Sequence, residues 1–268
     1  MSLTLGGGPL SGRTPADANY AVDGPAHKLF FQDFPRRVRA EFGGVTVLDS
    51  DRGRLLHETG LLPVLYVPIE DLRADLLEKT DHTTHCPFKG DAAYRSVRVG
   101  DRVAENAVWT YPEPVAGAEW LDGYAALYWG SMDAWYDEDE PIEGHLRDPY
   151  HRVDVRRTNR HATVTANAGG HTVTLAETDR PVVLSETGLP NRIYIPADDV
   201  HFDLLEPSET RTVCAYKGAA AYWSLRDGDA ALDDVAWGYP EPLEDAAKLD
   251  GYVCFLHDDV TVGLGPRR

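Results

Sequence analysis

Hydrophobic and polar residues alternate along short stretches of this chain, and turn-forming residues separate the stretches. Val38, Ala40 and Phe42 alternate with charged residues, and Gly43-Gly44 then offers a two-residue hairpin turn into the next apolar stretch. Further strands are predicted at 55–58, 64–67, 94–99, 107–111 and 124–129. No repeated stretch keeps an apolar 3.6-residue period beyond about ten residues, so we expect only short helices, near 70–75 and 116–119. The pattern predicts a mainly β fold.

The same pattern occurs twice, because residues 57–129 recur without a gap 128 positions later. Glu58-Thr59-Gly60 matches Glu186-Thr187-Gly188, and the second copy repeats the hairpin pattern at 163–175. A period this long is incompatible with a solenoid and indicates two globular domains. We expect an N-terminal arm, a first domain, a solvated acidic linker and a second domain, with bounds at 1–34, 35–130, 131–157 and 158–264.

The charge of the chain is strongly negative, with 44 acidic against 26 basic residues and a formal net charge of -18. Because phosphate binding needs a basic face, we expect no nucleic acid partner. Charged residues interrupt every apolar stretch, so we expect no membrane association either. The first fifteen residues lack the apolar segment of a signal peptide, and we expect a cytoplasmic protein.

Cysteine and histidine spacing predicts neither a disulfide framework nor a metal site. The chain has three cysteines and no CxxC pair. His82, His85 and Cys86 form a set that can bind zinc, but the second copy has Thr210 and Val213 in place of the two histidines. We therefore expect reduced thiols, no metal and no cofactor.

The order of the repeated motifs resembles the DUF427 family, in a tandem two-domain form. The motifs are Glu-Thr-Gly, Tyr-x-Pro, Thr-x-Cys-x-x-Lys-Gly, Tyr94-x-Ser96 and Trp-x-Tyr-Pro-Glu-Pro, and they cover nearly all of both copies. The resemblance implies a β-tent-like fold, and the family carries a nucleotidyltransferase-like label. Several β-tent relatives bind zinc through paired CxxC knuckles, which this sequence does not have.

One polar set in each copy is a candidate for catalysis. Cys and Lys are kept between the copies while the intervening Pro87-Phe88 becomes Ala215-Tyr216, so the polar side chains are held more tightly than the residues between them. A lysine near a cysteine can activate the thiol or bind an anion. The alternative is a buried thiol with a structural Lys–Glu ion pair. The candidates are Glu58, Cys86 and Lys89, and in the second copy Glu186, Cys214 and Lys217.

Aromatic residues form a second candidate set, for ligand binding. Tyrosine and tryptophan rings on a concave surface can stack on a planar ligand, although alternating aromatic residues in strands are also typical of core packing. The candidates are Tyr66, Tyr94, Trp109, Tyr111, Tyr194, Tyr222, Trp237 and Tyr239.

These residues leave three hypotheses open for the function. The first is that each domain binds a small planar or anionic ligand through aromatic stacking and one charge of each sign. The second is an enzyme with a Cys/Lys site, transferase-like as the family label implies. The third is a protein-interaction module whose two repeats pair within the chain. The sequence has no phosphate-binding loop, dinucleotide fingerprint or hydrolase elbow to support a common enzyme class.

Overall fold

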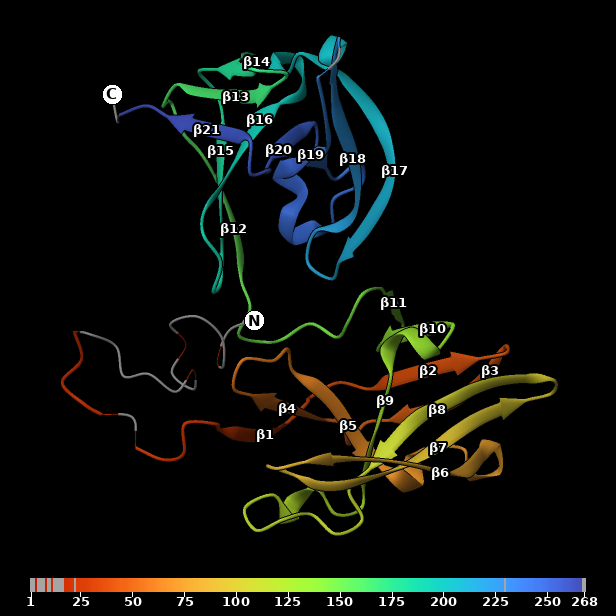
Figure 1. The fold of residues 1–268 in the computed structure, drawn as a ribbon. Helices are drawn as coiled ribbons and strands as arrows, with labels where there is room; N and C mark the ends of the chain where they lie inside the picture. The colour runs from red at the N-terminus through yellow and green to blue at the C-terminus, as the bar shows by residue number, and fades with distance from the viewer. Residues whose placement is uncertain are drawn as a thin grey trace. The chain divides into compact units, whose positions relative to one another are not determined.

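The computed structural model of this chain describes residues 3, 8, 11, 17–21, 23–228 and 230–266. It divides into two compact units, a first unit of Met1–Tyr150 and a second unit of His151–Arg268. Both are built mainly from strands (Figure 1). The prediction of a mainly β chain made of two tandem copies with short helices is confirmed. Within the described residues, no helix has the length and apolar character needed to cross a membrane.

The first unit contains a seven-stranded and a four-stranded antiparallel sheet. The larger sheet has the order β1-β4-β5-β9-β8-β7-β6. Its strands are β1 (Leu29–Asp33), β4 (Arg54–Glu58), β5 (Val64–Pro68), β6 (Leu77–Cys86), β7 (Gly90–Val99), β8 (Arg102–Thr110) and β9 (Tyr124–Leu127). The smaller sheet has the order β11-β10-β2-β3, with β2 (Val38–Phe42), β3 (Val45–Ser50), β10 (Ala134–Asp137) and β11 (Glu140–Ile142).

The second unit repeats the larger sheet in the order β12-β15-β16-β20-β19-β18-β17. Its strands are β12 (Val153–Arg157), β15 (Val182–Glu186), β16 (Arg192–Pro196), β17 (Leu205–Cys214), β18 (Gly218–Asp227), β19 (Ala230–Gly238) and β20 (Tyr252–Phe255). The smaller sheet has three strands in the order β14-β13-β21, with β13 (Ala162–Ala168), β14 (His171–Thr178) and β21 (Val260–Leu264).

All helical segments among the described residues are short 3-10 turns. They are η1 (Ile69–Asp71), η2 (Ala74–Leu76), η3 (Glu119–Leu121), η4 (Trp129–Ser131), η5 (Ala197–Asp199), η6 (Phe202–Leu204) and η7 (Glu244–Leu249). The first two occupy the expected helical stretch near 70–75, and η3 begins at the end of the stretch expected at 116–119. Asp71 of η1 and Asp199 of η5 occupy equivalent positions in the two copies. Asp71 accepts a hydrogen bond from Ser50 at 2.6 Å and Asp199 accepts one from Thr178 at 2.5 Å, so both carboxylates hold a helical turn to a neighbouring strand.

Some segments that we expected to be an arm and a linker belong to the sheets. Strand β1 lies within the predicted arm, and the predicted linker contributes β10, β11 and β12. Trp135 of β10 is buried in the core of the first unit, because its strand lies inside the smaller sheet between β11 and β2. Most of residues 1–22 of the predicted arm lie outside the described residues.

The predicted hairpin at Gly43-Gly44 is present, and its turn depends on glycine. The two residues have φ values of +61° and +75°, the left-handed pair that a two-residue turn requires. Gly169 and Gly170 take +58° and +82° at the same place in the second unit. Both units therefore use the same backbone geometry to join the first two strands of their smaller sheet.

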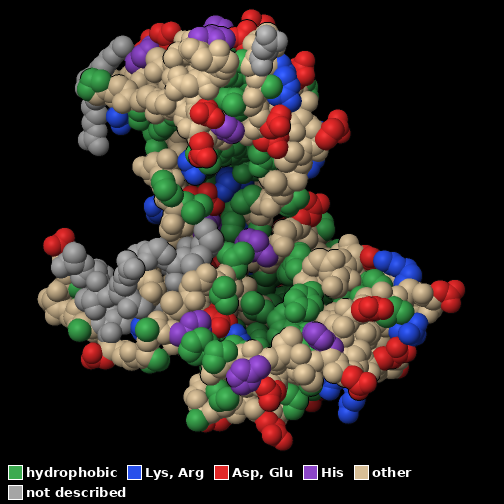
Figure 2. Space-filling view, viewed as in Figure 1, with side chains coloured by type: hydrophobic (Ala, Val, Ile, Leu, Met, Phe, Trp, Pro, Cys, Tyr) green, Lys and Arg blue, Asp and Glu red, His purple; other side chains and the backbone are tan. Residues whose placement is uncertain are grey.

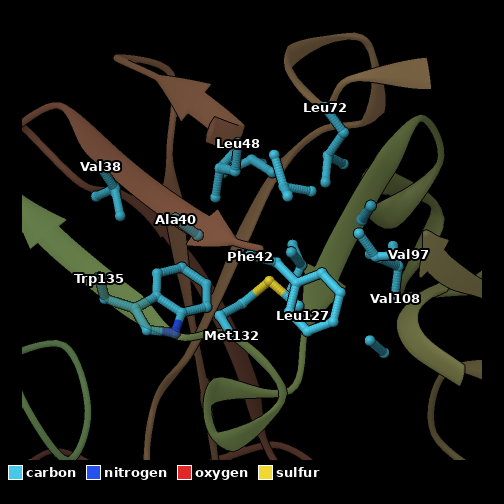
Figure 3. Close-up of a cluster of buried hydrophobic side chains, with 14 of the residues drawn as sticks. Val38, Ala40, Phe42, Leu48, Leu72, Val97, Val108, Leu127, Met132 and Trp135 are labelled. Carbon is cyan, nitrogen blue, oxygen red and sulfur yellow. The ribbon is translucent and has the colours of Figure 1, made fainter. Parts of the chain in front are cut away.

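The main core of the first unit lies between its two sheets (Figure 3). Val38, Ala40 and Phe42 of β2 point inward at alternate positions, as the sequence pattern predicts, and meet Val97 and Val108 of the larger sheet. The second unit has an equivalent core between its sheets. A separate apolar cluster lies on the other face of each larger sheet and contains most of the candidate aromatic residues.

A matched irregularity in each unit explains the Tyr94-x-Ser96 motif. Asn106 and Asp234 both have φ +51° where the pairing of the two long strands shifts register. Ser96 accepts a hydrogen bond from the Asn106 backbone N–H at 3.1 Å, and Ser224 accepts one from Asp234 at 3.0 Å. The serine hydroxyl therefore stabilises a β-bulge and has no need of a role in catalysis.

Candidate functional site

Three side chains from distant parts of the first unit meet in a buried cluster. Glu58 ends β4, Lys89 lies in the turn between β6 and β7, and His27 precedes β1. The Lys89 ammonium donates to Glu58 Oε2, and His27 Nε2 lies 2.8 Å from Glu58 Oε1. Only 7% of the Glu58 side chain and 9% of the Lys89 side chain are exposed. We call these three residues, and their counterparts in the second unit, the His–Glu–Lys cluster.

The second unit builds the same cluster from His151, Glu186 and Lys217. Lys217 Nζ donates to Glu186 Oε1 at 2.6 Å, and His151 Nε2 lies 3.0 Å from the same oxygen. Burial acts to raise the pKa of Glu186, but the hydrogen bonds from His151 and Lys217 outweigh it and lower the pKa to about 2. Glu186 is therefore a carboxylate at neutral pH.

The Glu-Thr-Gly motif fixes the carboxylate and the histidine relative to each other. The backbone of Lys28 donates to Thr59 Oγ1 at 2.9 Å and accepts from the Thr59 N–H at 3.1 Å. Arg152 and Thr187 make the same pair of bonds at 2.9 and 3.0 Å. The threonine thus ties the end of one strand to the chain just before its neighbour, where the histidine lies.

The Lys-Gly pair needs its glycine because the backbone turns sharply beside another chain segment. Gly90 has φ +107°, and a Cβ at this position would lie 3.0 Å from the Glu113 carbonyl oxygen. Gly218 has φ +100° and the same 3.0 Å approach to Glu241. The Pro-Glu-Pro segment after β8 therefore packs on this turn and holds the lysine in place.

The candidate aromatic residues belong to one apolar cluster in each unit, and most of them are buried. Tyr66, Tyr94 and Tyr111 are buried while Trp109 is partly exposed. Trp109 Nε1 donates to the Tyr66 hydroxyl at 3.2 Å, and the Tyr94 hydroxyl lies 2.9 Å from Thr84 Oγ1. Burial, with nearby Tyr111, Glu58 and Cys86, raises the pKa of Tyr66, so its hydroxyl stays protonated.

The second unit keeps this arrangement, with one more partly exposed ring among the four. Tyr194 and Tyr239 are buried, and Tyr222 and Trp237 are partly exposed. The Tyr222 hydroxyl lies 2.9 Å from Thr212 Oγ1, as its counterpart does in the first unit. Only the partly exposed rings have a surface that is open to solvent, and the buried tyrosines pack in the same apolar clusters.

The aromatic residue two positions after each cysteine packs on the histidine. Phe88 stacks on His27 with ring centroids 3.7 Å apart and planes 11° from parallel. Tyr216 covers His151 at 4.1 Å and 35°. Of the two residues between Cys and Lys, the first changes from Pro87 to Ala215, whereas the second stays an aromatic ring that packs on the histidine in both copies.

The three cysteines differ in exposure. Cys86 and Cys214 are partly exposed beside the His–Glu–Lys cluster, and Cys254 is buried. Burial raises the pKa of the Cys254 thiol to about 12. His85 is paired with Asp91 at 2.6 Å and His82 packs edge-on against Tyr94. Among the described residues, no three histidine, cysteine, aspartate or glutamate side chains lie together to hold a metal ion.

Sequence reasoning missed the two histidines. His27 and His151 are 124 positions apart, whereas the rest of the cluster repeats at 128, so a comparison without gaps does not align them. Each histidine is followed by a basic residue, Lys28 or Arg152, just before the strand begins. An alignment of the two copies that allows a four-residue gap would have matched these segments. The strand pairing shows the equivalence, since Leu29 and Val153 face Glu58 and Glu186.

A family model described as a domain of unknown function, DUF427, matches residues 31–138 and 154–264. The two matches coincide with the two repeats, and the resemblance noted in the motifs is confirmed. Both histidines of the clusters lie just before the matched segments. A comparison with curated proteins gives no match to this chain.

Proposed function

This chain belongs to the DUF427 family, and we propose that each of its two units binds a small planar or anionic ligand beside the His–Glu–Lys cluster. The observation that carries this proposal is the presence of the same buried, charged cluster in both units. Removing a carboxylate and an ammonium from water costs several kcal/mol, and apolar residues of similar volume often fold equally well. Two copies that both keep the charges therefore favour a functional role for them.

The surroundings of the cluster support a planar ligand. Trp109 is partly exposed and packs against the exposed Tyr128 with ring centroids 4.6 Å apart. Figure 2 shows hydrophobic side chains gathered on one face of the first unit. A flat ligand would stack on the indole and direct its polar edge to the lysine ammonium.

A second candidate is an enzyme in which Cys86 or Cys214 is the nucleophile, transferase-like as the family label implies. The partial exposure of both thiols supports it. However, Lys89 and Lys217 already pair with a carboxylate, so their charge is compensated and stabilises a neighbouring thiolate less. This pairing weakens the case for thiol catalysis.

Thermal unfolding of the full chain tests the proposal with three probes: nicotinate as a planar anion, uracil as a planar neutral molecule and acetate as a small anion. A ligand present at a hundred times its Kd stabilises the folded state by about 2.7 kcal/mol. We expect nicotinate to raise the Tm more than uracil and acetate. If none of the three changes the Tm at millimolar concentration, the proposal is contradicted.

Matched tryptophan variants assign the binding to a unit. Trp109→Leu and Trp237→Leu should each remove the nicotinate effect in one unit. Trp129→Leu is the control, because Trp129 stacks on Trp135 in the other core and not in this cluster. Loss of the effect in the control alone would place the ligand elsewhere.

A further inference from the structure

The second unit contains an arginine-rich cavity that lies away from the His–Glu–Lys cluster. It has a volume of about 990 Å³, and four arginines line it with polar residues and Tyr252. These arginines are Arg156, Arg157, Arg160 and Arg180. His151 precedes the start of β12 and Arg157 ends it, so the cluster and the cavity lie at opposite ends of a five-residue strand that rises about 3.3 Å per residue.

Two of the four guanidinium charges are not neutralised by a carboxylate. Arg160 donates to the backbone carbonyls of Gly265 at 2.6 Å and Leu264 at 3.2 Å, and carbonyls cancel no charge. Arg157 has no carboxylate within ion-pair distance in the part of the chain that the structure describes. The acidic residue of the lining, Asp179, lies 3.1 Å from His161. The cavity is therefore a local excess of positive charge in a strongly acidic chain.

The equivalent face of the first unit lacks the unpaired arginine charge of the second. The pairing of β1 with β4 places Gln32 and Asp33 where β12 has Arg156 and Arg157. Asp33 forms an ion pair with Arg54 at 2.9 Å, whereas Arg157 faces Val182. Gln32 accepts a hydrogen bond from the Tyr150 hydroxyl at 2.8 Å, so a following segment of the chain contacts this face.

We propose that the cavity of the second unit is a separate binding site for a small molecule with two or more oxyanion groups, either phosphates or carboxylates. Guanidinium groups recognise both through paired N–H donors. Arg157 and Arg160 supply positive charge that no carboxylate neutralises. Arg156 and Arg180 place further N–H donors at the wall of the cavity. The site belongs to the second unit alone, and it does not depend on the function proposed for the His–Glu–Lys cluster.

Calorimetric titration of the full chain with pyrophosphate and with citrate tests this site. We expect saturable binding of at least one probe, and the preferred probe distinguishes a phosphate from a carboxylate ligand. Arg157→Asp, which gives this position the residue of the first unit, should raise the Kd at least tenfold. Arg226→Gln removes one positive charge from β18 and should leave the Kd within twofold.

The controls separate a built site from general charge attraction. If Arg226→Gln weakens binding as much as Arg157→Asp, the binding is nonspecific and the proposal is overturned. Absence of binding for both probes overturns it as well. Circular dichroism of Arg157→Asp should match that of the wild type, because Arg157 is exposed and contributes no buried contact. If it does not match, Arg157→Gln replaces it in the same titration.

Discussion

The His–Glu–Lys clusters of the two units share their chemistry but differ in access to solvent. In the first unit 22% of the His27 side chain is exposed, and its stacking partner Phe88 is 42% exposed. In the second unit the values are 3% for His151 and 5% for Tyr216. Glu58 uses one oxygen for each partner, whereas Glu186 binds both partners through Oε1.

This difference indicates that the duplicated units have diverged in how a ligand would reach them. The charged residues and the glycine that positions the lysine are the same, but the aromatic cover is open in the first unit and closed in the second. Displacing a buried ring costs contact energy, so ligand exchange should be faster in the first unit.

The largest effect is expected from removing the lysine of either cluster. Lys89→Met and Lys217→Met each leave a buried carboxylate without its ion-pair partner, which typically costs about 3–5 kcal/mol of unfolding free energy. Urea denaturation of the full chain, followed by circular dichroism, measures the loss. Equal losses would show that both clusters are equally important for folding.

The double variants Glu58→Gln/Lys89→Met and Glu186→Gln/Lys217→Met are the controls for these losses. Each removes both charges, so most of the stability should return. If a double variant is as unstable as its single lysine variant, the cost comes from packing and not from an unpaired charge.

A smaller loss of unfolding free energy is expected when the glycine that follows each lysine is replaced by alanine. Gly90→Ala and Gly218→Ala place a Cβ at positive φ beside a backbone carbonyl, and such strain costs about 1–3 kcal/mol. The same denaturation experiment measures it. Gly44→Ala is a useful comparison, because Gly44 has positive φ but no atom within 4 Å of an added Cβ. Gly90→Ala should therefore be less stable than Gly44→Ala.

The alternation of apolar residues was enough to predict the strands that are buried on one face. Strand β2, with Val38, Ala40 and Phe42 buried at alternate positions, is an example. The glycine pairs marked the hairpin turns after β2 and β13. Strand β6 was missed because Leu77–Cys86 is polar and mostly exposed, so its strand state comes from pairing with β7 and leaves no hydrophobic period. Edge strands are held by neighbours that a local pattern does not contain.

The candidate site could be predicted in part. The repeat identified Glu58 and Lys89 and their counterparts, because a duplicated charge in a variable loop is visible in a single sequence. It could not identify His27 or His151, because each histidine contacts a glutamate that is 31 or 35 positions away in the sequence. The offset between the copies also changes from 128 to 124 between the glutamates and the histidines. Such contacts depend on the order of strands in the sheet, which the sequence pattern left open.

The stability of the first unit should depend on pH through His57. The second unit should lack this dependence, because it has Ser185 at the equivalent position. The His57 ring is fully buried against Phe30 and Tyr150, and among the described residues neither ring nitrogen has a hydrogen-bond partner. Burial lowers its pKa below 6.5, although the charge of Asp148 opposes this. The folded protein then binds fewer protons than the unfolded chain below pH 6.5, and stability falls as the pH falls.

Stability curves between pH 7.5 and 5 check this prediction. The wild type should lose up to about 1.4 kcal/mol per pH unit below pH 6.5, and His57→Leu should lose less over the same range. Glu186 does not interfere, because its lowered pKa of about 2 makes its contribution fall only below about pH 4.5. Parallel curves for the wild type and His57→Leu would mean that folding does not shift the pKa of His57.

The smallest effect on stability, but a clear kinetic one, is expected for the thiols. Cys86 and Cys214 are partly exposed and should react with an aromatic disulfide reagent in the native protein, whereas Cys254 should react only after unfolding, since burial raises its pKa to about 12. Cys86→Ser and Cys214→Ser assign the two native reactions. Because Phe88 is exposed and Tyr216 is buried, Cys86 should react faster than Cys214. Equal rates would show that the reagent reaches Cys86 and Cys214 equally easily. The two units would then differ in solvent access only at their histidines.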